Sequence, residues 1–333
     1  MKNSDYKLLV RILQTKEPNL LKSANNLFAN YYSKEKITLT KEYILARGNI
    51  PILLIAHLDT VFKSPPAEIY CDQEKQIMWS PQGLGADDRA GVFAIIKILS
   101  RGYRPYVCFT TGEEVGGIGA HALVRDYPKF PENLKYIVEL DRQGDNDCVF
   151  YDCANDDFTV YIESFNFITD WGTFTDISIL CPKWGIAGVN LSVGYVREHS
   201  FQETLNLQAL ECTIEKVISM LNHINDSPSF EYIPDPMANY YNFMAKYNYP
   251  LSYFIPITSE KRQCCKCHKV FSADDVFPVK AKNFTGVKYY CPDCVGEDVD
   301  WCEICGQPFE VDSYNDLICP DCAKKYRFTE CIN

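Results

Sequence analysis

Histidines and acidic residues follow several short apolar runs in this chain, and their spacing suits a metal centre. His57 and Asp59 stand two positions apart, just after the apolar run 51–56. On an extended segment their side chains point to the same side. The Asp59 carboxylate can therefore accept the second imidazole N–H and hold the His57 ring toward a metal ion.

Further candidates occupy comparable places later in the chain. Asp87 lies in a glycine-rich turn that enters a predicted helix, Glu113 and Glu114 lie in a glycine loop after an apolar run, and Asp141 and His199 come after two more such runs. Each residue taken alone could be a turn, cap or solvent-exposed residue. Together they offer carboxylate and imidazole ligands, which suit Zn²⁺. Two neighbouring glutamates at a metal can divide the labour, one as ligand and one in proton transfer.

In order, the motifs H-x-D, G-A-D-D, G-E-E, a strand-terminal Asp and a late His resemble the co-catalytic di-zinc exopeptidase superfamily, over residues 40–225. That superfamily includes zinc aminopeptidases, peptidase T-like tripeptidases, carboxypeptidases and deacylases, and the segments 56–61 and 85–91 are most similar to the tripeptidase branch. The resemblance implies two catalytic zinc ions and a cis peptide bond between Asp87 and Asp88. It implies that His57 and Asp141 hold one zinc, that Glu114 and His199 hold the other, that Asp87 bridges both, that Asp59 orients His57, and that Glu113 is the general base.

The intervals between the ligands depart from parts of this superfamily. Some branches insert a dimerisation domain between the fourth and fifth ligands, and another branch inserts a lid between the first two. The intervals from Asp141 to His199 and from His57 to Asp87 are too short for either insertion. The catalytic domain is therefore expected to be lidless, like the simple zinc aminopeptidases.

The periodicity of apolar residues predicts the elements that position these side chains. Predicted strands are 43–46, 51–56, 106–110, 135–140 and 187–193, with a hairpin over 69–79. Predicted helices lie within 4–32 and over 90–99, 119–127, 175–181 and 205–224, with Thr175 or Asp176 as the cap of the fourth, and Asp176 is interpreted as a cap residue. Buried strands alternating with helices indicate an α/β fold with a mostly parallel mixed sheet flanked by helices.

The chain is expected to contain a catalytic domain, a linker and a small C-terminal module. The catalytic domain is assigned to residues 1–227. A proline- and aromatic-rich linker packed on it covers 228–261, and the module covers 262–333.

Four C-x-x-C pairs distinguish the C-terminal module. Without a signal peptide a reducing cytoplasm is the default compartment, where such pairs are metal ligands more often than disulfides. Two C-x-x-C turns complete one closed tetrahedral zinc site, so the module is expected to hold two structural zinc ions in zinc-ribbon-like knuckles. The eight thiols are Cys264, Cys267, Cys291, Cys294, Cys302, Cys305, Cys319 and Cys322.

The sequence allows two ways of combining the four C-x-x-C pairs into zinc sites, and more than one role for the knuckles. Pairing in sequence order is favoured, and an interleaved cross-brace, as in RING-like or FYVE-like modules, is the alternative. Cys265 and His268 are further candidate ligands, though less favoured. Lys and Arg outnumber Asp and Glu over 262–294, but acidic residues dominate over 295–333. The second half should repel nucleic acid, so a protein partner or a stabilising role is favoured.

Bulk composition narrows the partners further. The formal net charge of −11 argues against general attraction to nucleic acid or to an anionic membrane. No apolar run is long enough to span a bilayer.

Three functions compete. The first is an aminopeptidase that uses water as nucleophile, because no G-x-S-x-G elbow offers a covalent alternative. The second is a carboxypeptidase or N-acyl amino-acid deacylase on the same metals, which needs a cation for the substrate carboxylate; Arg197, Arg142 and Arg89 are the candidates. The third is a zinc-ribbon adaptor that binds protein without turnover.

Overall fold

The computed structural model describes residues 1–130, 134–235, 261–272, 276–280, 287–291, 294, 299–301 and 308–310. The chain divides into two units, Met1–Asp235 and Pro236–Asn333.

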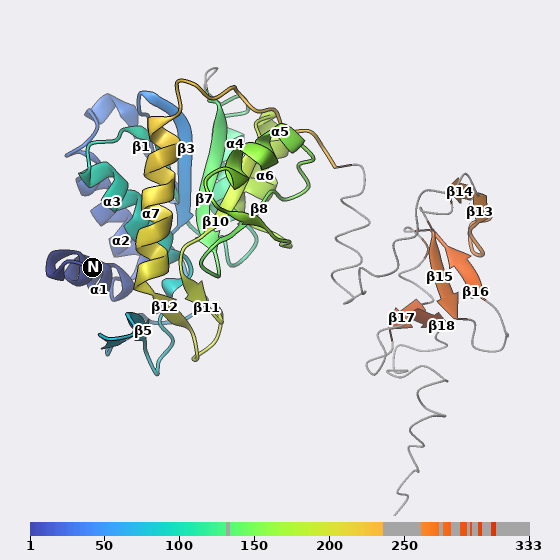
Figure 1. Ribbon diagram of the computed structural model, residues 1–333, viewed down its shortest axis with the longest axis horizontal. Coiled ribbons are helices and arrows are strands. Elements are labelled where there is room, and N and C mark those ends of the chain that lie inside the picture. The colour runs from blue at the N-terminus through green and yellow to red at the C-terminus, as the bar shows by residue number, and fades with distance from the viewer. Residues whose placement is uncertain are drawn as a thin grey trace, which may run out of the picture. The chain divides into compact units, whose positions relative to one another are not determined.

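A mixed eight-stranded sheet forms the centre of the first unit (Figure 1). The strand order is β1-β2-β6-β3-β7-β10-β8-β9, and the four central strands β6, β3, β7 and β10 run parallel. The bounds are β1 Ile37–Leu39, β2 Tyr43–Ala46, β3 Ile50–His57, β6 Pro105–Thr110, β7 Tyr136–Arg142, β8 Asp147–Val149, β9 Ile168–Thr169 and β10 Gly188–Ser192. The predicted α/β fold with a mostly parallel sheet is confirmed.

Helices cover both faces of this sheet. Their bounds are α1 Asn3–Leu13, α2 Glu17–Phe28, the short 3₁₀ helix Lys34–Lys36, α3 Ala86–Ser100, α4 Ile118–Asp126, α5 Asp156–Glu163, α6 Asp176–Trp184 and α7 Leu207–Asn222. Figure 1 shows α3 and α7 on one side of the central strands and α4 and α6 on the other. The alternation of side chains along β3 serves both layers: Leu54 packs with the α3 and α7 side chains, whereas Leu53 and Ile55 pack with those of α4 and α6.

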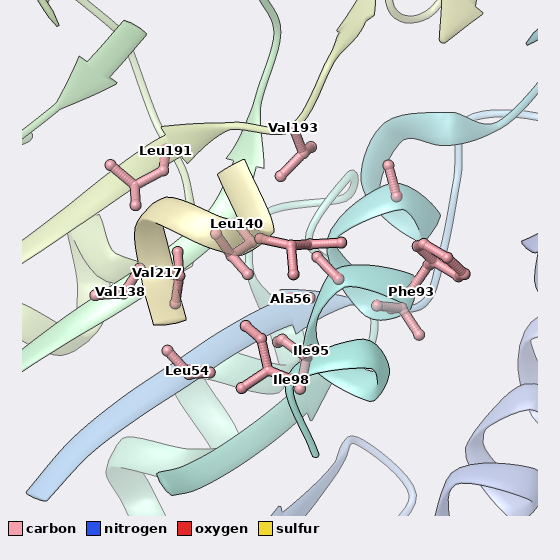
Figure 2. Close-up of a cluster of buried hydrophobic side chains, with 14 of the residues drawn as sticks. Leu54, Ala56, Phe93, Ile95, Ile98, Val138, Leu140, Leu191, Val193 and Val217 are labelled. Carbon is pink, nitrogen blue, oxygen red and sulfur yellow. The ribbon is translucent and has the colours of Figure 1, made fainter. Parts of the chain in front are cut away.

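The larger apolar core lies between the sheet and helices α3 and α7 (Figure 2). The side chains of Leu54, Val138 and Leu191 rise from neighbouring strands, and Ile98 and Val217 meet them from the two helices. All five are buried. This packing fixes the strands whose ends carry the candidate ligands.

A second sheet of four short strands has the order β11-β12-β5-β4. Its strands are β4 Tyr70–Asp72, β5 Ile77–Trp79, β11 Tyr195–Val196 and β12 Thr204–Asn206. β4 and β5 pair antiparallel, which confirms the predicted hairpin. The loop between β11 and β12 carries His199. The second sheet thus pairs strands from residues 70–79 with strands from residues 195–206.

The segment between β7 and α6 holds three elements that the periodicity did not predict, namely β8, α5 and β9. Asn155 caps α5 by accepting a hydrogen bond from the Phe158 N–H at 3.0 Å. The interpretation of Asp176 as a helix cap is wrong. Thr175 is the N-cap of α6, and the buried Asp176 side chain instead accepts a hydrogen bond from the Thr110 hydroxyl.

The first part of the predicted linker, 228–235, belongs to the first unit. Phe230 is buried in its core, and Glu231 and Pro234 form bridges with Ile186 and Cys153. The rest of the linker, up to residue 260, lies outside the described residues.

The second unit contains short strands. They are β13 Lys261–Gln263, β14 Val270–Ser272, β15 Phe277–Lys280, β16 Val287–Tyr290, β17 Val299–Trp301 and β18 Pro308–Glu310. β13 and β14 form a hairpin, and the other four form one sheet in the order β16-β15-β18-β17. Among the described residues of both units, no helix has the length and apolarity needed to span a bilayer.

Candidate metal centre

The candidate ligands meet at one edge of the large sheet. β6, β3 and β7 are parallel neighbours, so their carboxyl ends lie side by side. His57 ends β3, Asp141 lies near the end of β7, and Glu114 lies in the loop after β6. Asp87 stands in the first turn of α3, and His199 comes from the β11–β12 loop.

Asp87 lies between the two histidines and divides its carboxylate between them. Its Oδ1 is 3.1 Å from His57 Nε2, and its Oδ2 is 3.1 Å from His199 Nε2. Asp141 Oδ1 lies 3.5 Å from His57 Nε2, and Glu114 Oε2 lies 2.9 Å from His199 Nε2. The five residues thus form two groups, each of one imidazole and one carboxylate, that share Asp87.

The chemistry of this donor set fits two cations. Asp87, Glu114 and Asp141 bring three carboxylates together, and Glu114 Oε1 is buried with no hydrogen-bond partner in the part of the chain that the structure describes. Burial raises the pKa of Glu114 to about 7 and that of Asp141 to about 6, with repulsion from Asp87 adding to each. Divalent cations would relieve both the repulsion and the missing partners, and three protein ligands per metal leave room for water.

Asp88 also lies within ligand reach of His57 and Asp141. Its two oxygens already accept hydrogen bonds from backbone N–H groups, Oδ2 from His57 and Oδ1 from Gly91, each at 3.1 Å. It is fully buried, so we favour Asp87 as the shared ligand. Gly91 allows this packing, because a Cβ there would lie 2.0 Å from the Leu140 carbonyl oxygen. The peptide bond between Asp87 and Asp88 is cis, as the resemblance implies.

Asp59 contacts both sides of the centre. Its Oδ1 lies 3.4 Å from His57 Nδ1, and its two oxygens accept hydrogen bonds from the Glu113 and Glu114 N–H groups, each at 3.2 Å. Burial opposes its ionisation, but the His57 ring and the Glu114 N–H more than compensate, so the pKa of Asp59 is lowered. A carboxylate here fixes the His57 ring and the glutamate loop together.

Glu113 borders a cavity of about 150 Å³ that also reaches Asp87, Asp141 and His199. Its Oε2 is 4.0 Å from His57 Nε2. Burial, reinforced by the Asp141 and Asp176 charges, raises the pKa of Glu113 to about 9. Bound cations would favour its ionised form, which is the form a general base needs.

The ligands depend on residues that sequence reasoning missed. Asn190 exchanges two hydrogen bonds with the Asp141 backbone, at 2.8 and 2.7 Å. The hydroxyls of Tyr195 and Thr175 donate to the Asp141 carboxylate at 3.0 and 3.1 Å. Asn190 could have been found as an amide between apolar residues in the predicted strand 187–193.

Glu203 supports the Asp87 turn and was also missed. Its Oε2 accepts the Gly85 N–H at 2.6 Å, and its Oε1 accepts the Asp87 N–H at 3.0 Å. The side chain is fully buried. Nothing in the local sequence distinguishes it from the half-buried acids nearest to it, Glu198 and Glu211.

The three candidate arginines occupy different places. Arg142 borders the 150 Å³ cavity. Arg197 is exposed, contacts Gln202 at 3.2 Å and is not among the described residues that line that cavity. Arg89 is buried and donates to the carbonyl oxygens of Leu58 and Ile12 at 3.2 and 3.0 Å, so it holds α1 against the site rather than facing it.

Four cysteines gather separately in the second unit. Ligand atoms of Cys264, Cys267, Cys291 and Cys294 all lie within 4.8 Å of one another. Cys267 Sγ is 3.7 Å from Cys291 Sγ, near the separation of about 3.8 Å that two 2.3 Å Zn–S bonds give in a tetrahedron. This joins the first two C-x-x-C pairs, whereas Cys302, Cys305, Cys319 and Cys322 lie outside the described residues.

Solved structures of similar fold support the architecture. An aminopeptidase, PepT, from Bacillus cereus matches with a TM-score of 0.52 and 14% identity, over 66% of this chain and 98% of its own. A tripeptidase from Staphylococcus aureus matches with a TM-score of 0.50 and 12% identity, over 67% of this chain and 98% of its own. At such identities the likeness concerns the fold alone. No protein-family model and no curated protein matches the sequence.

Proposed function

We propose that the first unit is a zinc-dependent exopeptidase, and specifically an aminopeptidase. The observation that carries this proposal is the Asp87 carboxylate, with one oxygen 3.1 Å from His57 and the other 3.1 Å from His199. Asp141 and Glu114 complete the two groups of ligands. The fold shared with an aminopeptidase and a tripeptidase agrees with this chemistry. The alternative on the same metals is a carboxypeptidase or N-acyl amino-acid deacylase.

The division of labour follows from the positions of the side chains. When bound, two zinc ions would acidify a water molecule and polarise the scissile carbonyl. Glu113, at the cavity but outside the two groups, takes the proton from the attacking water and delivers it to the leaving amine. Asp59 keeps the His57 ring in place, and Asp87 holds the spacing of the two groups.

Two structural zinc ions complete the proposed cofactors. Cys264, Cys267, Cys291 and Cys294 are spaced for one of them. Cys302, Cys305, Cys319 and Cys322 are assigned to the other by their C-x-x-C spacing. A peptide is the proposed substrate, a protein is the proposed partner of the cysteine knuckles, and the thiol ligands suit a reducing cytoplasm.

Metal analysis together with turnover tests this function. We expect purified protein to hold close to four zinc ions and the double variant His57→Ala/His199→Ala to hold about two. Glu113→Gln should keep all the metal yet lose turnover of an unblocked aminoacyl amide by 100-fold or more, given the roughly 10²–10⁴-fold contribution of a general base.

The control is Glu215→Gln, which changes an exposed glutamate paired with Arg101 on the surface. An unblocked aminoacyl amide tested beside an N-acyl amino acid separates the aminopeptidase from the deacylase. The proposal fails, and the chain acts as a binding adaptor, if wild type turns over neither substrate and the Glu113→Gln variant replaces wild type in the cell without loss of function.

A further inference from the structure

Arg142 is the last residue of β7 and directly follows the candidate ligand Asp141. Its side chain borders the 150 Å³ cavity beside Glu113 and His199. It is the one Lys or Arg among the described residues that line this cavity. Arg142 is therefore the one guanidinium or ammonium group that the described lining places next to the candidate metal ligands.

The Arg142 guanidinium is only partly satisfied. One terminal nitrogen, Nη2, donates a hydrogen bond to Asp170 Oδ2 at 2.5 Å. Its Nε is buried and has no hydrogen-bond partner among the described residues. A buried donor without a partner is uncommon in native proteins and calls for an explanation, such as a ligand that supplies the acceptor.

The geometry points to Arg142 as the group that binds a carboxylate of the substrate. This inference rests on the proposed exopeptidase function and names its substrate class. An arginine presents its N–H groups in a fork that matches a carboxylate. Asp170, whose side chain is half exposed, pairs with one terminal nitrogen of Arg142, and among the described residues no acceptor faces the Nε side of the guanidinium. An uncharged apolar side chain would leave the Nε–H buried and unpaired.

Two lining residues of the cavity suit an acidic residue at the amino end of a peptide. Glu198 lines the same cavity and is placed to face the α-ammonium group, while Arg142 takes the side-chain carboxylate. A carboxylate can also come from the C-terminus of a short substrate, so the test distinguishes the two sources.

The first arm compares N-terminal side chains on zinc-loaded full-length protein. The substrates are the α-glutamyl, glutaminyl, leucyl and lysyl p-nitroanilides. We expect kcat/KM for the glutamyl substrate to exceed that for the glutaminyl one by about 10- to 100-fold, the discrimination that a charged hydrogen bond supplies. Arg142→Gln should bring this ratio close to one, and Arg142→Lys should restore it only in part.

The second arm compares Leu-Gly with Leu-glycinamide, which differ only in the terminal carboxylate. A preference for Leu-Gly that Arg142→Gln abolishes, with no preference for the glutamyl amide, would assign the carboxylate to the C-terminus. Arg125→Gln is the matched control, because Arg125 forms a similar Arg–Asp pair with Asp126 but is 65% exposed on α4.

Several outcomes would overturn the inference while leaving the exopeptidase intact. One is a wild-type enzyme that prefers the leucyl or lysyl substrate over the glutamyl one and ignores the terminal carboxylate. Another is an Arg142→Gln variant whose kcat/KM falls equally on all substrates, because Arg142 would then only anchor the Asp170 segment.

A binding measurement keeps the inference testable without turnover. Calorimetric titration of L-glutamate and of L-glutamine into the zinc-loaded Glu113→Gln protein needs no catalysis. We expect L-glutamate to bind at least tenfold more tightly, and the added change Arg142→Gln to remove the difference. Equal affinities for the two amino acids, together with no selectivity for Leu-Gly, would refute carboxylate recognition even if peptidase activity is confirmed.

Discussion

The two units assemble their candidate metal sites in opposite ways. In the first unit the ligands come from five places between residues 57 and 199, carried by a sheet that already buries a large apolar core. In the second unit the described cysteines come from two short C-x-x-C turns that lie close together. We therefore expect the first fold to stand without metal and the second to depend on it.

Removing the metal should affect the two units differently, and this is the largest effect that we expect. A chelator should leave the first unit folded and unfold the second, because structural zinc contributes about 10–16 kcal/mol to such modules. Hydrogen exchange measured by peptide checks this: amides of β15 and β16 should lose protection while those of β3 and β7 keep it. Cys267→Ser should mimic the chelator in the second unit only. Equal loss of protection in both units would contradict the comparison.

Within the first unit, Glu203 should matter more than an exposed glutamate. Glu203→Gln replaces one acceptor oxygen by an NH₂ group that faces a backbone N–H of Gly85 or Asp87. Leaving a buried donor unpaired costs about 1–3 kcal/mol, which denaturant unfolding of the first unit can measure. Glu215→Gln, at 60% exposure, is the control and should change the free energy of unfolding by less than about 0.5 kcal/mol. A loss as small in Glu203→Gln would show that the Asp87 turn is held by other contacts.

Asp59 should affect metal affinity rather than the fold. Asp59→Asn keeps the shape of the side chain but weakens the acceptor that His57 Nδ1 and the glutamate loop share. Changes of this kind cost about 10- to 100-fold in metal affinity. Competition with a fluorescent chelator measures the zinc affinity of the two proposed sites in the first unit. Unchanged affinity would mean that packing alone orients the His57 ring.

The way in which each site is assembled explains which of its ligands could be predicted from the sequence. The ligands His57, Asp141 and Glu114 could be predicted because each follows an apolar strand, and parallel strands bring their carboxyl ends to one edge. Asp87 and His199 were candidates as well, from a glycine-rich turn and from the stretch after the run 187–193, and the resemblance to a known superfamily supplied their roles. For the cysteines, the C-x-x-C spacing alone predicted a cluster, and the structure brings the first two pairs together.

The misses share a physical cause. Glu203, Asn190 and Tyr195 act through contacts between segments distant in sequence, and no local pattern encodes such contacts. Asp176 was misread because an acid at a helix start is usually a cap or a helix-dipole partner. Its side chain turns inward to Thr110, which only the packing of α6 against the sheet determines.

The stability of the first unit should depend on pH when no metal is bound. Burial raises the pKa of Asp176 and of Glu203 to about 7 in each case, so the folded first unit binds more protons than the unfolded chain above pH 4. The stability of metal-free protein should therefore fall as pH rises from about 4 through 7, by up to about 1.4 kcal/mol per pKa unit for each of the two groups, and Tm should fall with it. Calorimetry in EDTA at pH 5.5 and 8 measures this, and Asp176→Asn should flatten the trend because an amide does not titrate. Saturating zinc should oppose the trend, since metal binding favours the ionised carboxylates and strengthens with pH. If Tm of the metal-free first unit rises between these pH values, the buried acids are ionised in the folded state without metal, and the cation requirement of the site loses its electrostatic basis.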